Sequence, residues 1–323
     1  MSDVLEVEHL MAEPGEANHG YLSVTEMPDG TPMRIPVALV NGANDGPTMY
    51  LQAISDGDEL NGLSVIRRVL GRLDPKCLDG RVIAVPIVNI HALHAYQAFS
   101  PIDNKKMNRC FPGRQDGTSS ERIAYRLFQN AVLQSDYVVD LHQGGIRPMI
   151  DEVRVRVDRR RRIHRDCMEM ARVFGTGYIL DARGPEGQLA RSAPDEGIPT
   201  IDPELGGCIG WDESSICKGV TGVENLLKHY DMIAGKPSIP SCQTVVDGFL
   251  SLLSNRGGIL EYRAQLYDVL EKGASVADVT DPFGEVIETL KAPEESVMWS
   301  KALRPMVASG EVVATLGKNI RTI

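Results

Sequence analysis

Residues 53–62 read Ala-Ile-Ser-Asp-Gly-Asp-Glu-Leu-Asn-Gly, and they join a predicted buried strand to a predicted helix. The apolar run at 48–52, Thr-Met-Tyr-Leu-Gln, indicates the strand, and apolar residues recur at helical spacing through 60–73. The junction carries three carboxylates, at Asp56, Asp58 and Glu59. Because like charges this close repel one another, the stretch indicates either a cation site or carboxylates that cap the helix.

The surrounding chain alternates between strand-like and helix-like segments from about residue 35 to 240. Strands are predicted at 36–40, 81–86, 137–141 and 178–180, and helices near 60–73, 119–134, 161–174 and 214–233. This alternation predicts an α/β domain at 35–245, with a mixed, mostly parallel sheet flanked by helices. Ligands of such folds bind beyond the carboxyl ends of the strands, where both 53–62 and His142 fall.

The two ends of the chain have a different sequence pattern. We interpret 1–34 as an N-terminal β segment and 246–323 as a smaller all-β domain, with the boundary near 242–256. Residues 273–279 realign with 310–316, which predicts two similar β units packed face to face. Such a β module resembles the biotinyl or lipoyl carrier fold, but neither unit has a lysine at a hairpin tip in an obvious attachment motif. A covering or assembly role is therefore favoured over a carrier role.

Composition excludes several classes of protein. The chain has 323 residues, 42% of them hydrophobic, and a formal net charge of −10, which predicts a compact soluble protein. An acidic chain whose one dense basic run is Arg159 to Arg162 is a poor candidate for nucleic-acid binding. The first twenty residues do not resemble a signal peptide, no apolar stretch is long enough to span a membrane, and the six cysteines form no C-x-x-C pair. A cytoplasmic protein with reduced thiols is therefore expected.

Three residues form the candidate metal site. Asp56 and Glu59 are three positions apart, so a nearly helical turn would point both carboxylates to one side. His142 would complete a three-ligand site with an open position, and Asp140 or a backbone carbonyl could hold its second ring nitrogen. The alternative is that Asp56 and Asp58 cap the helix and that His142 is an ordinary strand-end residue.

Further motifs occur in a recognisable order: Pro-Ile-Asp at 101–103, Met-Asn-Arg-Cys-Phe-Pro-Gly at 107–113, Asp-Leu-His at 140–142 and Pro-Thr-Ile-Asp-Pro-Glu-Leu-Gly-Gly at 199–207. In order and spacing they resemble the succinylglutamate desuccinylase and aspartoacylase family, a branch of the zinc carboxypeptidase-like hydrolases. The resemblance extends over roughly residues 35–320, the C-terminal β domain included.

The resemblance implies roles for individual residues. Glu59 and His142 match metal ligands, and Asn108 and Arg109 match the pair that holds the substrate carboxylate. A guanidinium suits that task because it donates two parallel hydrogen bonds. Glu204 matches the carboxylate that takes a proton from the attacking water and returns it to the leaving amine.

The sequence departs from the family at Asp56, where the family motif has a histidine ligand. A carboxylate is an acceptable ligand for Zn²⁺ and a better one for harder ions such as Mn²⁺ or Mg²⁺. Two carboxylates and one imidazole leave a divalent ion formally neutral, so the activated water is expected to be less acidic. Ser55 is one residue out of register as a substitute; His91 and His94 could supply a ligand, although a packed or solvent-facing role is favoured for both.

The resemblance implies a metal-dependent hydrolase that removes the acyl group from a small N-acyl amino acid. A non-catalytic ligand-binding relative is one alternative, which the retention of Glu204 disfavours because a binder needs no general base. A carboxypeptidase is the other, which the C-terminal β domain disfavours because in this family such a domain restricts the cleft to small substrates. The sequence leaves open the acyl group, the amino acid, the metal and assembly into a homo-oligomer.

Overall fold

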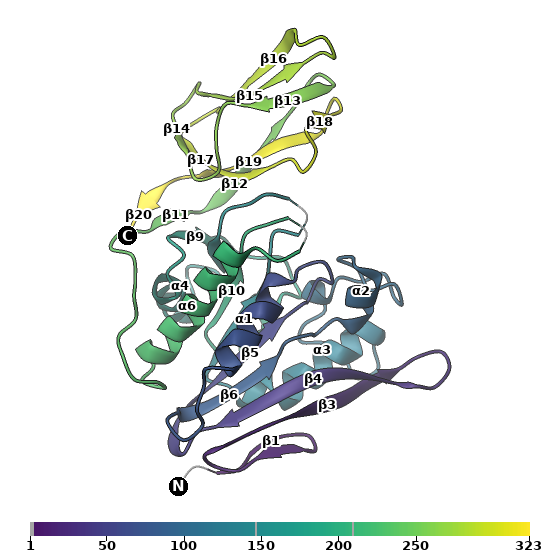
Figure 1. Cartoon of the computed structure of the whole chain (residues 1–323), viewed down its shortest axis with the longest axis vertical. Helices are drawn as coiled ribbons and strands as arrows, with labels where there is room; N and C mark the ends of the chain where they lie inside the picture. The colour runs from purple at the N-terminus through teal and green to yellow at the C-terminus, as the bar shows by residue number, and fades with distance from the viewer. Residues whose placement is uncertain (1–2, 146, 209) are drawn as a thin grey trace.

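The computed structural model describes residues 3–145, 147–208 and 210–323 (Figure 1). Its central element is a ten-stranded sheet, in which the strands follow the order β20-β11-β9-β8-β10-β7-β5-β6-β4-β3. In chain order these strands are β3 (Glu16–Glu26), β4 (Pro32–Asn41), β5 (Asn44–Ala53), β6 (Asp79–Val85), β7 (Tyr137–Leu141), β8 (Glu152–Val155), β9 (Tyr178–Asp181), β10 (Thr200–Glu204), β11 (Thr244–Val246) and β20 (Arg321–Thr322).

Most of the strand pairings inside this sheet are parallel. β10 pairs with β7, β7 with β5, and β5 with β6, all in parallel, and so do β11 with β9 and β9 with β8. Antiparallel pairings join β8 to β10 and build both edges. The predicted α/β class with a mixed, mostly parallel sheet is confirmed.

Helices cover both faces of the sheet. The alternation of side chains along β5 shows this, since Met49 and Leu51 pack in one core cluster and Tyr50 in another. The first cluster includes residues of α1 (Asn61–Leu70), α4 (Ile163–Phe174) and α6 (Glu213–His229), and the second includes residues of α3 (Ser119–Asn130). Shorter helical elements are α2 (Ile90–Ala95), α5 (Leu189–Ser192), η1 (Met107–Arg109), η2 (Val132–Gln134) and η3 (Ala193–Glu196).

The last helix is shorter than its sequence pattern predicts. α6 ends at His229 rather than near residue 233. Asp231 has a φ of 55°, a left-handed conformation that does not continue an α-helix. The apolar spacing carries on past the helix because Ile233 still packs against the same core.

The C-terminal strands form two four-stranded antiparallel sheets, drawn at the top of Figure 1. Their orders are β12-β19-β17-β14 and β16-β15-β13-β18. The strands are β12 (Gly248–Leu253), β13 (Gly258–Tyr262), β14 (Val269–Leu270), β15 (Ser275–Thr280), β16 (Val286–Lys291), β17 (Ser296–Lys301), β18 (Met306–Val307) and β19 (Val312–Lys318). The two sequence repeats correspond to β14–β15 and β18–β19, and each copy places its short strand in one sheet and its long strand in the other.

Both ends of the chain return to the larger sheet. β11 and β20 flank the C-terminal sheets in sequence and pair with each other at the edge of the ten-stranded sheet. At the other end, β1 (Leu5–Val7) and β2 (Leu10–Ala12) form a hairpin before β3 enters the same sheet. The division into units 1–34, 35–245 and 246–323 stays a prediction. None of the helices in the described ranges has the length and hydropathy that a membrane span requires.

Candidate metal centre and active site

The candidate ligands and the candidate base meet at the carboxyl ends of three neighbouring strands. Asp56 and Glu59 follow β5, His142 follows β7, and Glu204 ends β10. One ligand atom from each of Asp56, Glu59 and His142 lies within 4.8 Å of the other two, and all three residues are buried. The structure thus brings together the three residues that the sequence singles out as metal ligands.

A tight turn holds the two carboxylates of the β5 end. The amide of Glu59 donates to the carbonyl of Asp56 at 3.2 Å, so the turn closes over three residues. Gly57, between them, packs against the backbone of α2: a Cβ atom there would lie 2.1 Å from the carbonyl carbon of Ala92. A larger residue would displace the turn that aims both carboxylates.

Neither aspartate of this turn caps the following helix. Leu60 is the N-cap of α1 and provides no side-chain cap. The side chain of Gln143 serves instead, because its Oε1 accepts from the amides of Leu60 at 2.9 Å and Asn61 at 3.1 Å. The helix-cap interpretation of Asp56 and Asp58 is therefore wrong, and Gln143 is a contact that the sequence does not reveal.

Carboxylates lie beside both nitrogens of the His142 ring. Its Nδ1 lies 2.8 Å from Oε2 of Glu59, and its Nε2 lies 3.1 Å from Oδ2 of Asp140. Asp140 thus stands where a partner for the second ring nitrogen was expected. Nε2 makes no hydrogen bond of acceptable geometry among the described residues, so Asp140 acts on the ring through its charge.

The carboxylates around His142 change its protonation. Burial lowers the pKa of His142, but Asp140 and Asp202 outweigh it and raise the pKa well above the usual value. Burial and the nearby Asp56 raise the pKa of Glu59 to about 7. Glu59 and His142 therefore hold a proton between them in the metal-free protein.

These residues fit a divalent cation. Oδ1 of Asp56 is buried and has no hydrogen-bond partner among the described residues, although such atoms are normally paired. Two carboxylates and an imidazole, with Nδ1 directed at Glu59, form a suitable donor set. The cluster would hold the ion through Asp56, Glu59 and His142.

Lys106 also reaches this cluster, which the sequence analysis missed. Its Nζ lies 2.5 Å from Oδ2 of Asp56, and its side chain is 28% exposed. Burial lowers the pKa of Lys106, yet Asp56 and Glu59 raise it above the usual value, so the ammonium is charged. No sequence signal identifies this contact, because Lys106 belongs to a different segment, directly before η1.

Glu204 is fixed beside His142 by the backbone. The amide of His142 donates to the carbonyl of Pro203 at 2.8 Å, and the amide of Leu205 donates to the carbonyl of His142 at 3.0 Å. Oε1 of Glu204 lies 2.5 Å from Nη1 of Arg154, a residue of β8. Burial raises the pKa of Glu204 to about 8, against the opposing effect of Arg154.

Asn108 and Arg109 lie on the turn η1 that follows Lys106. Oδ1 of Asn108 is buried without a hydrogen-bond partner in the described part of the chain. Arg109 is exposed, its guanidinium donates to the carbonyl of Asn108, and it has no carboxylate partner among the described residues. An exposed guanidinium with free donors is suited to a carboxylate ligand.

The other histidines considered as ligands lie outside the cluster. His91 is buried, with Nε2 3.3 Å from Oγ of Ser119, and His94 is exposed. Both have the packed or solvent-facing positions that the sequence analysis favoured.

The C-terminal sheets brace the segment that follows His142. The amide of Ile150 donates to the carbonyl of Trp299 at 3.1 Å, and the amide of Lys301 donates to the carbonyl of Pro148 at 3.0 Å. Asp151 accepts from the hydroxyl of Tyr267 at 3.0 Å. The covering role of the C-terminal sheets stays a prediction.

The basic run is neutralised by nearby carboxylates. Arg159 pairs with Asp181 at 2.9 Å, Arg160 pairs with Asp158 at 2.7 Å, and Arg161 pairs with Asp195. Such pairing offsets the positive charge of three of the four arginines of this run.

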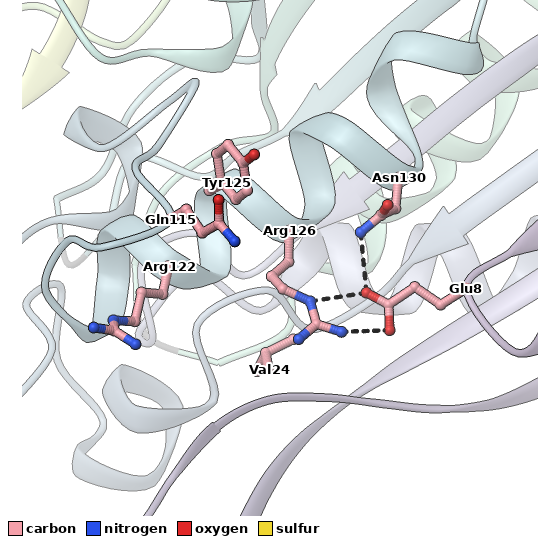
Figure 2. Close-up of a pocket in the computed structure, with 7 residues that line it drawn as sticks. All are labelled: Glu8, Val24, Gln115, Arg122, Tyr125, Arg126 and Asn130. Atoms are coloured by element: carbon pink, nitrogen blue, oxygen red, sulfur yellow. Dashed lines mark hydrogen bonds and ion pairs between the residues drawn. The ribbon is translucent and has the colours of Figure 1, made fainter.

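A surface cavity of about 620 Å³ lies apart from the candidate ligands (Figure 2). Across it, Arg126 makes two hydrogen bonds to Glu8, at 2.9 and 2.6 Å, and Asn130 adds a third at 3.0 Å. None of the candidate ligands lines this cavity, whose lining residues are Glu8, Val24, Gln115, Arg122, Tyr125, Arg126 and Asn130.

An imidazole and two carboxylates gathered beyond parallel strands are a ligand arrangement found in metal-dependent hydrolases. Residues 45–230 match the model of the succinylglutamate desuccinylase/aspartoacylase catalytic domain. The chain therefore belongs to this family, as its motifs predicted.

Individual relatives resemble the chain along nearly its whole length. An N-alpha-acetyl-L-2,4-diaminobutyric acid deacetylase of Halomonas elongata is 28% identical, over 96% of this chain and 94% of its own. A succinylglutamate desuccinylase structure from Silicibacter sp. TM1040 superposes with a TM-score of 0.85, at 26% identity over 98% of both chains. The product-bound ectoine utilization protein EutE (DoeB) from Ruegeria pomeroyi gives 0.83 at 25% identity, over 93% of this chain and 95% of its own.

Proposed function

We propose that the protein is a metal-dependent amidohydrolase that removes the acyl group from a small N-acyl amino acid. The observation that carries the proposal is the position of Glu204 directly beside His142, one of the three convergent candidate ligands. A general base next to a cation site is the arrangement that metal-assisted hydrolysis of an amide uses. Family membership and the deacetylase relative support the same reaction.

Asp56, Glu59 and His142 would hold the ion. We propose Zn²⁺ first, and Mn²⁺ or another harder ion as the alternative, because Asp56 offers oxygen where the family motif has nitrogen. When bound, the ion supplies Lewis acidity toward the acyl carbonyl and the attacking water.

Glu204 is the proposed general base. Arg154 holds its Oε1, which leaves Oε2 to take a proton from the water and return it to the leaving amine. Its pKa of about 8 suits a group that both accepts and returns a proton near neutral pH.

Arg109 is the proposed anchor for the substrate. Its guanidinium would hold the carboxylate of the amino acid in a bidentate pair, with the amide of Asn108 beside it. Fixing the carboxylate orients the scissile amide relative to Glu204.

We also propose a cytoplasmic location, because all six cysteines are free and a cytosolic protein keeps its thiols reduced. Assembly into a homo-oligomer stays a prediction.

Release of free amine from a panel of N-acetyl and N-succinyl amino acids tests the proposal. N-α-acetyl-L-2,4-diaminobutyrate belongs in the panel because a relative is named for it. Protein stripped with a chelator and reloaded with Zn²⁺ or Mn²⁺ should hydrolyse at least one member, and the stripped protein none. Binding of these compounds without hydrolysis would favour the non-catalytic alternative, and release of C-terminal residues from peptides would favour the carboxypeptidase.

A further inference from the structure

Lys106 places a permanent positive charge inside the candidate metal cluster. Its ammonium lies 2.5 Å from Oδ2 of Asp56, whose side chain is 2% exposed. Asp56 is the position at which the sequence departs from the family motif. The one carboxylate that replaces a neutral ligand is thus also the one that carries a lysine partner.

The charges show why the carboxylate at position 56 and its lysine partner belong together. Asp56, Glu59 and a neutral His142 contribute two negative charges, so they would leave a divalent ion formally neutral. Adding the ammonium of Lys106 raises the total to +1. This is the charge of an ion held by two imidazoles and one carboxylate, the ligand set of the family motif.

The location of Lys106 gives it a second connection. It is the N-cap of η1, the turn that bears Asn108 and Arg109. Its ion pair therefore joins the proposed carboxylate-binding turn to the proposed metal ligands. A substitution of Lys106 should therefore affect both the proposed metal ligands and the proposed carboxylate-binding turn.

We propose that Lys106 is a positioning residue whose ammonium offsets the charge of Asp56. With it, the groups around a divalent ion at Asp56, Glu59 and His142 carry one negative charge instead of two, so the ion binds less tightly than the two carboxylates alone would allow. The inference rests on the metal site of the proposed function. It assigns Lys106 a role exerted through Asp56 rather than as a ligand.

The affinity for Zn²⁺, measured by competition with a chromophoric chelator, tests the proposal without recourse to activity. Lys106→Met should bind Zn²⁺ at least about tenfold more tightly than wild type, because the nearby cation is gone and Asp56 is left unpaired. If Lys106 only held the turn in shape, its loss would leave the affinity unchanged or weaken it. Either of those results would overturn the proposal.

A double-mutant cycle separates the charge effect from other effects of the substitution. In an Asp56→Asn background, which keeps the shape of the side chain but removes its charge, Lys106→Met should change the affinity by less than about threefold. Equal gains in both backgrounds would show that Lys106 does not act through Asp56 and would overturn the proposal.

Lys105→Met is the matched control. Lys105 is the neighbouring residue, but its ammonium lies 2.8 Å from Glu121, outside the cluster. Removing that charge should leave Zn²⁺ affinity at the wild-type value. Lys106→Gln serves as a second variant if the methionine variant does not fold, and its affinity should shift in the same direction.

Failure of the inference and failure of the proposed function give different results. If wild type and all variants bind no Zn²⁺ or Mn²⁺, the metal site itself is wrong. If wild type binds the ion and Lys106→Met does not bind it more tightly, only the role of Lys106 is wrong.

Discussion

Nδ1 of His142 lies 2.8 Å from Oε2 of Glu59, although 83 residues separate them along the chain. The contact exists because β5 and β7 are adjacent and parallel, so that their carboxyl ends meet at one edge of the sheet. The side chains are both buried, and together they hold a proton. Any cation that uses both as ligands has to displace it.

Metal affinity should therefore fall as the pH drops below about 7, the pKa of Glu59 in the metal-free protein. Below that pKa the carboxyl of Glu59 is protonated, and binding has to release its proton as well; above it, binding still has to release the proton of His142, whose pKa is raised well above the usual value, so the affinity keeps rising with pH. Zn²⁺ affinity measured between about pH 6 and 8, with proton release followed in weakly buffered solution, checks this. An affinity that does not change over this range would contradict the pKa and the ligand role together.

Glu204→Gln should leave metal content unchanged and lower turnover by at least about 10²-fold, because general-base catalysis is typically worth 10² to 10⁴. Glu152→Gln is the matched control, since Glu152 also pairs with Arg154, at 2.8 Å. Its turnover should stay much closer to wild type. Similar losses in both variants would mean that the guanidinium pairing matters and that Glu204 is not the base.

Arg109→Ala should weaken the binding of substrates with a free α-carboxylate far more than the binding of the corresponding amides. Only the acids lose a charge-assisted hydrogen-bonded pair, worth about 1.5 to 3 kcal/mol. Competition assays with acid and amide pairs measure the difference. Arg114→Ala controls for loss of positive charge, because Arg114 is exposed and pairs with Asp116. Equal losses for acid and amide would assign Arg109 a structural role.

The sequence predicts the parts of the site that follow from strand ends. Asp56, Glu59, His142 and Glu204 could be found because each comes directly after or at the end of a strand of the parallel core. The pairing of Asp140 with His142 could be anticipated because the two residues are on one strand, two positions apart, and so face the same side of the sheet.

Contacts between distant segments could not be predicted in this way. Lys106 reaches Asp56 from the turn before η1, Gln143 caps α1 from the end of β7, and Arg154 holds Glu204 from an antiparallel neighbour. Each depends on how segments pack, which hydrophobic periodicity does not encode. The return of β20 to the edge of the large sheet belongs to the same category, since two residues give no strand signal.

Gly57→Ala should reduce metal affinity and destabilise the protein. The new Cβ would lie 2.1 Å from the backbone of Ala92, so the turn between Asp56 and Glu59 has to move. Gly71→Ala is the control: its φ is −68°, and its nearest neighbour to a new Cβ would be the carbonyl of Arg67 at 3.4 Å. Metal titration and thermal unfolding of both variants check this. Equal behaviour would show that the close approach to α2 does not position the ligands.

The last prediction separates the two aspartates of the same turn. Asp56→Ala should sharply weaken metal binding, because it removes a ligand from the cluster of Asp56, Glu59 and His142. Asp58→Ala should leave the metal stoichiometry at the wild-type value, because Asp58 lies outside that cluster. Asp56→His keeps a ligand and should retain the ion.

Metal content of wild type and the three variants, measured side by side after purification without added metal, decides between the roles. Because neither aspartate caps α1, Asp58→Ala should show none of the stability loss expected of a lost cap, about 0.5 to 2 kcal/mol, whereas Asp56→Ala also leaves the ammonium of Lys106 without its partner. Equal metal content in Asp56→Ala, Asp58→Ala and wild type would remove Asp56 from the ligand set. A loss shared by both alanine variants would instead assign the effect to the overall negative charge of the turn.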